Sequence, residues 1–304
     1  MIIGNVAIVG LGALGIMYAK HFTEAIGKDH VRVIVNAERK ERYQQTGIYS
    51  NGEKCDFNYV DETEHMEPAD LVLFCVKGTT LKSAIETARQ QIGPHTIIMS
   101  ALNGISSEEH LANAFGKLNI VHTVSQGMDA VRDGNELRYT KMGELRIGID
   151  ALEKQSRLDS VVNFFNRTGF PYTIEADIKH RIWKKFMMNV GINQVVMLIE
   201  GTYGDVQKEG PSRDLMIDAM KEVILISKPE GINLTEQDMQ DNLDLLAVLS
   251  PDNMPSMRQD GLAKRYSEID LFSGTVIEKA KQYNIKVPTN QFLFDKITEI
   301  EATY

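Results

Sequence analysis

The chain has few cysteines and no long apolar run, and both shortages restrict what it can be. Its 304 residues include only Cys55 and Cys75, which cannot make a disulfide framework. No apolar stretch reaches the roughly 18 residues that cross a bilayer. The amino terminus also lacks the basic segment and the cleavage site of a signal peptide. We therefore expect a cytoplasmic protein that does not enter a membrane.

Basic residues are also fewer than acidic ones. Lys and Arg number 33 against 42 Asp and Glu, which gives a formal net charge of −9. This balance argues against a broad surface for nucleic-acid phosphates. The seven histidines are scattered, with no Cys/His cluster that predicts a metal site. With 43% hydrophobic residues, the chain can form sizeable cores, and at roughly 150 residues per domain its length favours two domains.

The pattern of apolar residues changes along the chain. Short apolar runs that predict strands occupy residues 5–9, 31–35, 71–76 and 96–101, and residues 14–25 and 80–91 between them have helical spacing. This alternation requires crossover connections, so it predicts an α/β fold with a doubly wound parallel sheet. Helical spacing then dominates in residues 182–199, 213–227, 235–249, 256–283 and 290–300. We expect a nucleotide-binding domain over 1–173 and an all-helical domain over 174–304, which the motifs below single out for substrate binding and catalysis.

A glycine fingerprint follows the first predicted strand. The run Gly10-Leu11-Gly12-Ala13-Leu14-Gly15 fits G-x-G-x-x-G, and a predicted helix begins within it. In a Rossmann-type sheet, such glycines permit a tight turn, let the backbone approach a pyrophosphate and let helix and strand pack closely. The free N–H groups of the helix terminus then favour the phosphate charge. The alternative is a purely structural turn without a ligand.

The end of the second predicted strand indicates which dinucleotide binds. An NAD site usually has Asp or Glu there to bind the ribose 2′-hydroxyl, whereas this chain has the neutral Asn36. Arg39 and Lys40 are placed to meet a 2′-phosphate, although Glu38 would repel it. On electrostatic grounds we favour NADP(H). A solvated start of a helix is the simpler interpretation of Arg39 and Lys40.

Two polar residues follow later strands of the predicted sheet. Lys77 comes after residues 71–76, and Asn103 comes after residues 96–101. Ligands of open α/β sheets bind outside the carboxyl ends of the strands, so both side chains are candidates to face the nicotinamide end of the cofactor. Solvation of their loops explains them equally well.

The first helix of the second domain carries three polar residues on an otherwise apolar sequence. Lys185, Asn189 and Asn193 are spaced i, i+4 and i+8, which keeps them within about 80° of one another around a helix. A helix that is apolar nearly all round is buried, so these side chains need partners. A substrate would supply them, and so would a polar seam between helices. Lys184 is expected to face solvent.

Two further candidates lie in the third quarter of the helical region. Ser256 begins the pattern S-x-x-Q, which predicts a helix N-cap. A helix N-terminus is also a natural carboxylate site, so Ser256 is a candidate to hold an anionic substrate group. Glu268 stands four residues after Lys264, a spacing typical of an ordinary surface ion pair.

Taken together, these motifs resemble the ketopantoate reductase (2-dehydropantoate 2-reductase) family. The resemblance covers most of the chain and includes the glycine fingerprint, Val76-Lys77, Asn103-Gly104, the Trp183-Lys184-Lys185 helix with its two asparagines, Ser256-Met257-x-Gln259-Asp260, Glu268-Ile269-Asp270 and Val287-Pro288-Thr289-Asn290. The glycines are common to many families. The Lys-x-x-x-Asn-x-x-x-Asn helix and the step from Ser256 to Glu268 are more specific.

The resemblance implies an activity and a set of roles. It implies a Rossmann domain with a helical carboxy-terminal domain, and NADPH-dependent reduction of ketopantoate to pantoate in pantothenate biosynthesis, on the pathway to coenzyme A. By resemblance, Lys185 is the catalytic general acid, and Glu268 positions the substrate and the lysine. Asn189 and Asn193 would hold the hydroxyl of the substrate, and Ser256 its carboxylate.

The same resemblance implies that Lys77 and Asn103 line the junction of cofactor and substrate, with Glu268 also near the cofactor. Two departures leave the identity of the 2-keto acid open. The family often has proline after the second asparagine, where this chain has Gln194, and residues 78–80 differ from the usual aromatic-containing loop.

Two other functions stay open on the sequence. One is a related hydroxyacid dehydrogenase of the same Rossmann-plus-helical type. The other is a non-catalytic NADP(H) sensor, which would have no need of a proton donor. The apolar faces of the predicted helices also leave open whether two copies pair as a homodimer.

Overall fold

The computed structural model describes all 304 residues, which divide into two compact units, Met1–Ile178 and Lys179–Tyr304. The division falls a few residues after position 173 because β12 (Tyr172–Ile174) pairs with β11 (Glu144–Gly148) and so belongs to the first unit. None of the helices combines the length and the apolar character that a membrane span requires.

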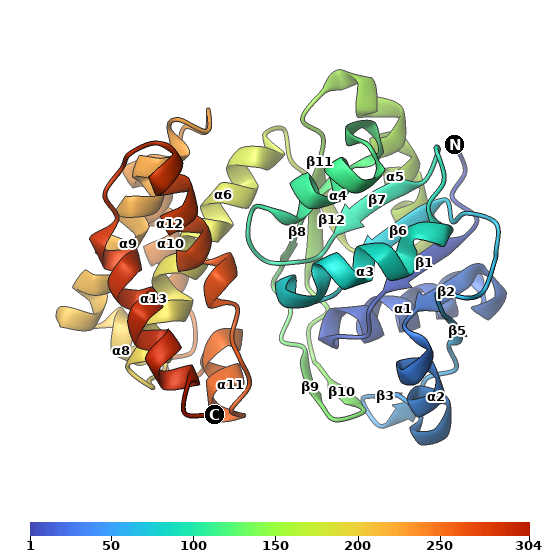
Figure 1. Ribbon diagram of the computed structural model, residues 1–304, viewed down its shortest axis with the longest axis horizontal. Coiled ribbons are helices and arrows are strands. Elements are labelled where there is room, and N and C mark those ends of the chain that lie inside the picture. Colours follow the sequence, from blue (N-terminus) through green and yellow to red (C-terminus); the bar gives the residue numbers. More distant parts are fainter. The chain divides into compact units, whose positions relative to one another are not determined.

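A five-stranded parallel sheet forms the centre of the first unit (Figure 1). Its strands, in spatial order, are β5 (Asn58–Val60), β2 (Val31–Ile34), β1 (Val6–Val9), β6 (Leu71–Phe74) and β7 (Ile97–Ser100). The chain runs from β1 to β2 and β5 on one side and then crosses to β6 and β7 on the other. The order therefore reverses between β1 and β6, and ligands of open α/β sheets bind at the carboxyl ends of the strands at such a point.

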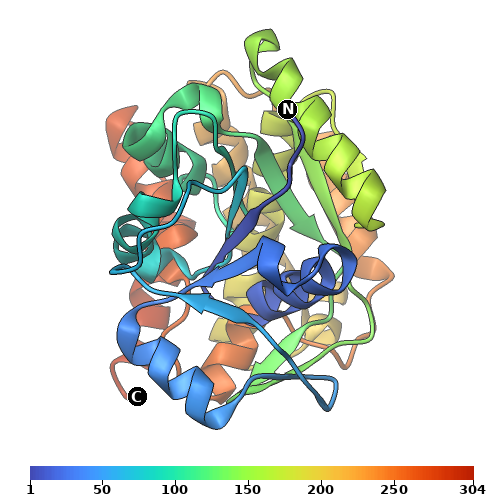
Figure 2. The same ribbon diagram turned by 90° about the vertical axis from the view of Figure 1, so that its right-hand side faces the viewer.

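Helices cover both faces of this sheet and confirm the Rossmann-type doubly wound architecture. Val6 and Ile8 point into a core shared with α1 (Ala13–Ile26) and α5 (Gln155–Thr168). Ala7 and Val9 point into a second core shared with α3 (Leu81–Ala88) and α4 (Ser107–Phe115), because alternate residues of a strand face opposite sides. In Figure 2, where this unit faces the viewer, the amino-terminal segment begins beside α5, and the Met1 amino group donates to Ser160 Oγ at 3.1 Å.

Two smaller sheets complete the first unit. One has the order β12-β11-β8, with β8 spanning His122–Gln126, and the bridge between Ile98 and Ile120 lies where it adjoins β7. The other has the order β4-β3-β10-β9, formed by β3 (Tyr49–Ser50), β4 (Glu53–Lys54), β9 (Val131–Asp133) and β10 (Glu136–Arg138). Between β2 and β3 lies α2 (Ala37–Thr46). Short 3-10 turns span Lys28–His30, Gly78–Thr80, Arg89–Gln91, Lys117–Asn119 and Leu152–Lys154.

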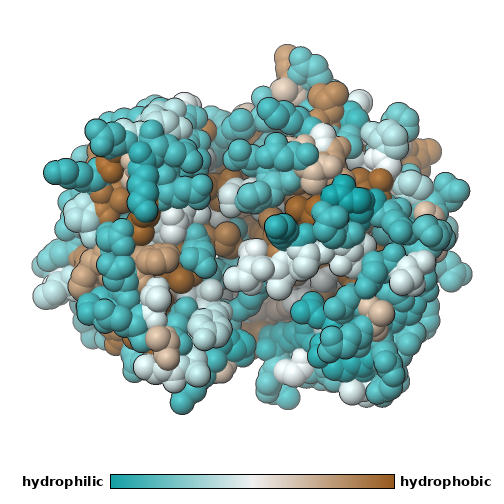
Figure 3. Space-filling view, viewed as in Figure 1, coloured by the Kyte–Doolittle hydropathy of each residue, from teal (hydrophilic) through white to brown (hydrophobic).

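The second unit is entirely helical, as the sequence predicts. Its helices are α6 (Ile178–Met188), α7 (Gln194–Leu198), α8 (Tyr203–Gln207), α9 (Pro211–Ser227), α10 (Glu236–Ala247), α11 (Ser256–Leu262), α12 (Ser273–Gln282) and α13 (Pro288–Glu301). Residues 189–197 are all buried, because α8, α9, α11 and α13 pack against α7. Hydrophilic residues predominate on the drawn face of each unit (Figure 3), so the apolar faces of these helices are directed mostly inward.

Two helices that the periodicity predicts as continuous are interrupted. Residues 182–199 contain a π-helical turn, η6 (Asn189–Asn193), between α6 and α7. Residues 256–283 are not one helix, because α11 ends at Leu262 and only the 3-10 turn η7 (Ile269–Leu271) precedes α12. The backbone ends α11 here: Lys264 has φ +48°, and the N–H of Arg265 donates to the carbonyl of Asp260 at 2.9 Å.

Candidate functional site

The predicted glycine turn lies at the carboxyl end of β1, where the order of the strands reverses. Gly10 has φ +89°, and a Cβ there would stand 2.4 Å from Val76 Cγ1. A Cβ at Gly15 would stand 2.1 Å from the carbonyl oxygen of Gly10, so the close approach of α1 to the end of β1 requires glycine at position 15. Gly12 is exposed, and a Cβ there would meet only the carbonyl oxygen of Cys75, at 3.2 Å.

The exposed side of this turn is suited to an anion. The first backbone bond of α1 runs from Ile16 N to Gly12 O, at 3.0 Å. The N–H groups of Ala13, Leu14 and Gly15 precede that bond and have no acceptor within the helix. Donors at a helix N-terminus, together with the helix dipole, favour a phosphate. The residues present therefore fit the pyrophosphate of a dinucleotide.

Arg132 braces this turn, although nothing in the sequence singled it out. Its guanidinium donates through Nη1 to the carbonyl of Leu11 and through Nε to the carbonyl of Gly134, the latter at 2.8 Å. It also lies over the ring of Tyr43, 5.7 Å from the ring centroid. An arginine in the short strand β9, more than 100 positions from the turn, has no local signal that could have revealed this contact.

Of the residues that follow β2, one caps a helix and two carry positive charge. Asn36 is the N-cap of α2, and its Oδ1 accepts the N–H of Arg39 at 3.1 Å. The side chain of Arg39 is exposed and has no hydrogen bond or ion pair. Lys40, in contrast, is paired with Asp61 at 3.0 Å and Glu64 at 2.6 Å. Lys40 therefore has two carboxylate partners, whereas Arg39 beside it has none.

Positive charge gathers around the hydroxyl of Tyr43 in α2. Burial would raise the pKa of Tyr43, but a hydrogen bond and the charge of Arg132, a hydrogen bond from Arg42 and the charge of Arg39 hold this pKa below its usual value. The guanidinium of Arg42 lies 5.1 Å from the centroid of the Tyr43 ring. Three guanidinium groups, that of the exposed Arg39 among them, thus act on one phenol.

Lys77 and Asn103 lie at the same edge of the sheet, since they follow the adjacent parallel strands β6 and β7. Lys77 is exposed, and its carbonyl accepts the N–H of Thr80 at 3.0 Å, which forms the turn that leads into α3. Asn103 is half-buried and precedes Gly104, whose φ of +91° turns the chain toward α4.

A buried polar chain that the sequence did not reveal supports the Asn103 loop. Ser107 Oγ donates to Glu108 Oε2 at 2.7 Å, and Ser100 Oγ donates to Ser107 Oγ at 2.8 Å. The N–H of Leu102 donates in turn to Ser100 Oγ at 3.3 Å. Burial raises the pKa of Glu108. The side chains of Ser100, Ser107 and Glu108 therefore link the end of β7 to the start of α4.

In the helical unit, Lys185 is half-buried on α6. Burial lowers the pKa of its amine to about 8, while the charge of Glu268 opposes this effect and that of Arg181 adds to it. Lys185 and Glu268, 83 positions apart in the numbering, are thus close enough for their charges to act on each other. A lysine whose pKa lies near the working pH is suited to donate a proton.

Asn189 and Asn193 are both buried, with 4% and 8% of their surface exposed, and Asn193 Nδ2 donates to Asn189 Oδ1 at 3.4 Å. They are the first and last residues of η6. Backbone bonds in a π-helix close over five residues, so each residue advances by a smaller angle than in an α-helix. Four residues make close to one turn in such a helix, so the two amides stay on the same side of it and meet.

Lys184 does not face solvent freely. It is paired with Asp241 and, at 3.3 Å, with Asp238, both on α10. Asn242 Nδ2 also donates to the carbonyl of Lys184 at 3.0 Å. The acidic residues of α10 therefore hold α6 against α10, and the neighbouring Lys184 and Lys185 interact with different carboxylates.

Ser256 is not a helix cap. The N-cap of α11 is Pro255, and Ser256 is the first helical residue, exposed and without a side-chain hydrogen bond. The expectation that Ser256 caps the helix is therefore wrong. The exposed hydroxyl of Ser256 lies at the N-terminus of α11, beside the first N–H groups of that helix. Because α11 packs against η6 and α7, this end belongs to the same group of helices as the two asparagines.

The surroundings of Glu268 differ from an ordinary surface ion pair. Lys264 lies outside α11, with φ +48°, and makes no ion pair. The preceding residue, Ser267, is buried, and its N–H donates to the buried carboxylate of Glu301 at 2.8 Å. A residue of α13 thus fixes the backbone beside Glu268, a contact that no local pattern predicts.

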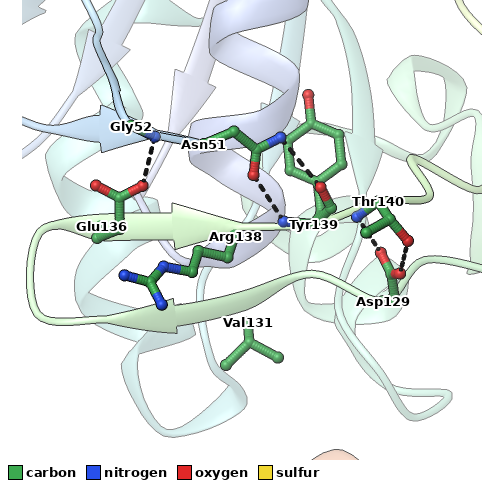
Figure 4. Close-up of a pocket in the computed structure, with 8 residues that line it drawn as sticks. All are labelled: Asn51, Gly52, Asp129, Val131, Glu136, Arg138, Tyr139 and Thr140. Carbon is green, nitrogen blue, oxygen red and sulfur yellow. Dashed lines mark hydrogen bonds between the residues drawn. The ribbon is translucent and has the colours of Figure 1, made fainter.

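A cavity of about 580 Å³ lies elsewhere, on the small sheet of β3, β9 and β10 (Figure 4). Several of its polar groups are bonded to one another: Glu136 accepts the N–H of Gly52 at 2.8 Å, and Asn51 exchanges two bonds with the backbone of Tyr139. None of the predicted site residues lines it. These bonds hold the strands of the small sheet together.

Comparison with known proteins assigns both parts of the chain. The family model described as "Ketopantoate reductase PanE/ApbA" matches residues 6–151, and "Ketopantoate reductase PanE/ApbA C terminal" matches residues 177–301. The 2-dehydropantoate 2-reductase of Vibrio cholerae is 23% identical over 303 residues, with 99% of each chain covered.

Solved structures share the fold at low identity. A ternary complex of D-mandelate dehydrogenase with NADH and anilino(oxo)acetate has a TM-score of 0.86 at 20% identity, over 98% of this chain and 99% of the other. A dimeric ketopantoate reductase from Staphylococcus aureus has a TM-score of 0.79 at 20% identity, with the same coverage.

Proposed function

The chain belongs to the ketopantoate reductase family of oxidoreductases, and from that premise we propose that it reduces ketopantoate to pantoate with NADPH. The observation that carries the proposal is that Lys185 and Glu268 lie close enough for their charges to interact, in the unit that also holds the buried Asn189 and Asn193. A non-catalytic sensor would have no use for an amine whose pKa is lowered to about 8.

Reduction of a ketone requires a hydride at carbon and a proton at oxygen. The dinucleotide supplies the hydride when bound. Lys185 donates the proton from its ammonium Nζ to the oxygen, on which negative charge grows as the hydride arrives. Glu268 holds the ammonium and keeps it protonated near neutral pH, because its negative charge favours the charged form.

The remaining polar residues of the helical unit orient the substrate. Asn189 and Asn193 present amides that can both donate to and accept from a hydroxyl. Ser256 offers an exposed hydroxyl together with the N-terminal N–H groups of α11, a combination suited to a carboxylate. We assign the hydroxyl of ketopantoate to the asparagines and its carboxylate to Ser256. Lys77 and Asn103 are assigned to the nicotinamide end of the cofactor.

The charges around α2 favour binding of NADPH over NADH. The exposed guanidinium of Arg39 has no partner of its own, and Arg42 and Arg132 add positive charge on the adjacent Tyr43. Asn36 places no carboxylate at the end of β2 itself. Glu38 is the acidic residue of the first turn of α2 and opposes a 2′-phosphate there.

The test is the rate of NADPH oxidation by the purified chain with ketopantoate, compared with pyruvate, 2-oxoisovalerate and phenylglyoxylate. We expect kcat/KM for ketopantoate to exceed the others by at least about tenfold, because only its hydroxyl can satisfy the two buried amides. A preference for phenylglyoxylate would instead favour a hydroxyacid dehydrogenase like the one with the similar fold. Tight NADPH binding without turnover of any keto acid would favour the sensor.

Three finer assignments accompany this proposal. Reduction of ketopantoate would place the chain in pantothenate biosynthesis, in the cytoplasm. The similar ketopantoate reductase from Staphylococcus aureus is dimeric, and we propose that this chain also pairs with a second copy. Light scattering of the purified chain measures its mass in solution directly.

A further inference from the structure

Gln194 is completely buried at the point where the π-helical turn passes into α7. Its Nε2 donates to the carbonyl of Val190 at 2.6 Å, and its Oε1 accepts the N–H of Ser273 at 3.0 Å. Its own backbone N–H donates to the carbonyl of Gly191, three residues back. One side chain therefore links the inside of η6 to the first residue of α12.

The position of the π turn is fixed on its other side by packing. A Cβ at Gly191 would stand 2.6 Å from two atoms of the Met220 side chain and 3.1 Å from the carbonyl oxygen of Met216, so only glycine lets this turn approach α9 so closely. A π turn departs from the regular bonding of the helices that flank it. It persists where surrounding contacts hold it, here α9 on one side and Gln194 on the other.

The contact with Ser273 belongs to a buried polar chain. Ser273 Oγ donates to Asn290 Oδ1 at 2.9 Å, and Asn290 Nδ2 donates to Glu222 Oε2 at 2.8 Å. Glu222 also accepts the N–H of Thr289 at 2.8 Å, at the start of α13. The donor that Gln194 Oε1 meets is thus held by α12, which is tied to α13 and α9.

We propose that Gln194 is a positioning residue for substrate binding: it holds the π turn in which Asn189 and Asn193 face each other. The inference rests on the proposed function only in assigning the substrate hydroxyl to these asparagines. Gln194 itself touches neither amide, and it acts through the carbonyl of Val190, which lies between them in the chain. Losing that bond lets η6 relax and separates the two amides.

The test is Gln194→Met, which keeps the length of the side chain and removes both hydrogen bonds. The matched control is Gln207→Met, since Gln207 Nε2 also bonds two backbone carbonyls of the helical unit, those of Leu246 and Leu249 at 2.8 and 2.9 Å. We expect Gln194→Met to raise the KM for ketopantoate about tenfold, with kcat changed less than about threefold and the KM for NADPH unchanged. Gln207→Met should leave all three constants as they are.

A milder variant guards against loss of folding. Ser273→Ala keeps the backbone N–H that Gln194 accepts but removes the bond to Asn290, so it should raise the KM for ketopantoate in the same direction by a smaller factor. Amide hydrogen exchange of residues 190–196 provides a readout that does not need turnover, and Gln194→Met should accelerate it more than Gln207→Met does.

The possible results separate the two proposals. If the wild-type chain turns over no keto acid, the proposed function fails, and faster exchange confined to Gln194→Met still supports the role of Gln194 in the π turn. An unchanged KM for ketopantoate in Gln194→Met, with an active wild type, overturns the positioning role. Equal exchange in the two methionine variants overturns it as well.

Discussion

The carboxylate of Glu268 opposes the effect of burial on the amine of Lys185. Burial lowers the pKa of Lys185 to about 8, and Glu268 keeps it from falling further, while Arg181 acts in the same direction as burial. The result is an ammonium group that is still protonated at neutral pH but releases its proton more readily than an exposed lysine. A proton donor for carbonyl reduction needs this balance.

Replacing Lys185 should abolish turnover and spare cofactor binding. Lys185→Met removes the proton donor, so we expect kcat to fall by about 10²- to 10⁴-fold. The dissociation constant of NADPH, measured by fluorescence titration, should stay within about twofold. Lys184→Met is the control, because Lys184 is paired with Asp238 and Asp241 and should be dispensable for chemistry. A comparable loss of NADPH affinity in Lys185→Met would contradict the role assigned.

The pH dependence of kcat should report the titration of the same amine. Since the pKa of Lys185 is about 8, the donor is lost as the pH rises past that value, and kcat should decline on the alkaline side. Glu268→Gln removes the charge that raises this pKa, so the alkaline limb should move to lower pH. A limb that stays in place in Glu268→Gln, with turnover still measurable, would show that another group limits the rate.

The strands and the main helices of this fold could be predicted, because continuous apolar runs and helical spacing are local properties. The glycine turn, Lys185 and the two asparagines could be found for the same reason. The ion pairs of Lys40 and Lys184 could not be predicted, because their carboxylate partners come from other elements, 21 to 57 positions away. Arg132 and Glu301 act through single backbone groups of distant segments, and such contacts leave no pattern in a sequence.

Arg39 should determine the preference for NADPH over NADH. Its guanidinium is exposed and without a partner, so Arg39→Gln removes a charge that only a 2′-phosphate would use. We expect the dissociation constant of NADPH to rise about 10- to 100-fold, the loss of a hydrogen bond to a charged group, and that of NADH to stay unchanged. Arg89→Gln, which breaks the pair with Glu86 on the surface of the same unit, should alter neither. Equal weakening of both cofactors would place Arg39 away from the 2′-position.

Ser256 offers a direct choice between a structural and a binding role. If it capped α11, Ser256→Ala would lower the free energy of unfolding by about 0.5–2 kcal/mol. Its hydroxyl makes no such bond, so we expect the Tm to stay the same and the KM for ketopantoate to rise about tenfold as one donor to the carboxylate is lost. Thr235→Ala is the matched control, because Thr235 Oγ1 does cap α10 by accepting the N–H of Asp238 at 3.3 Å. That variant should lower the Tm and leave the KM for ketopantoate unchanged. Each alanine variant should therefore change the quantity that the other leaves unchanged.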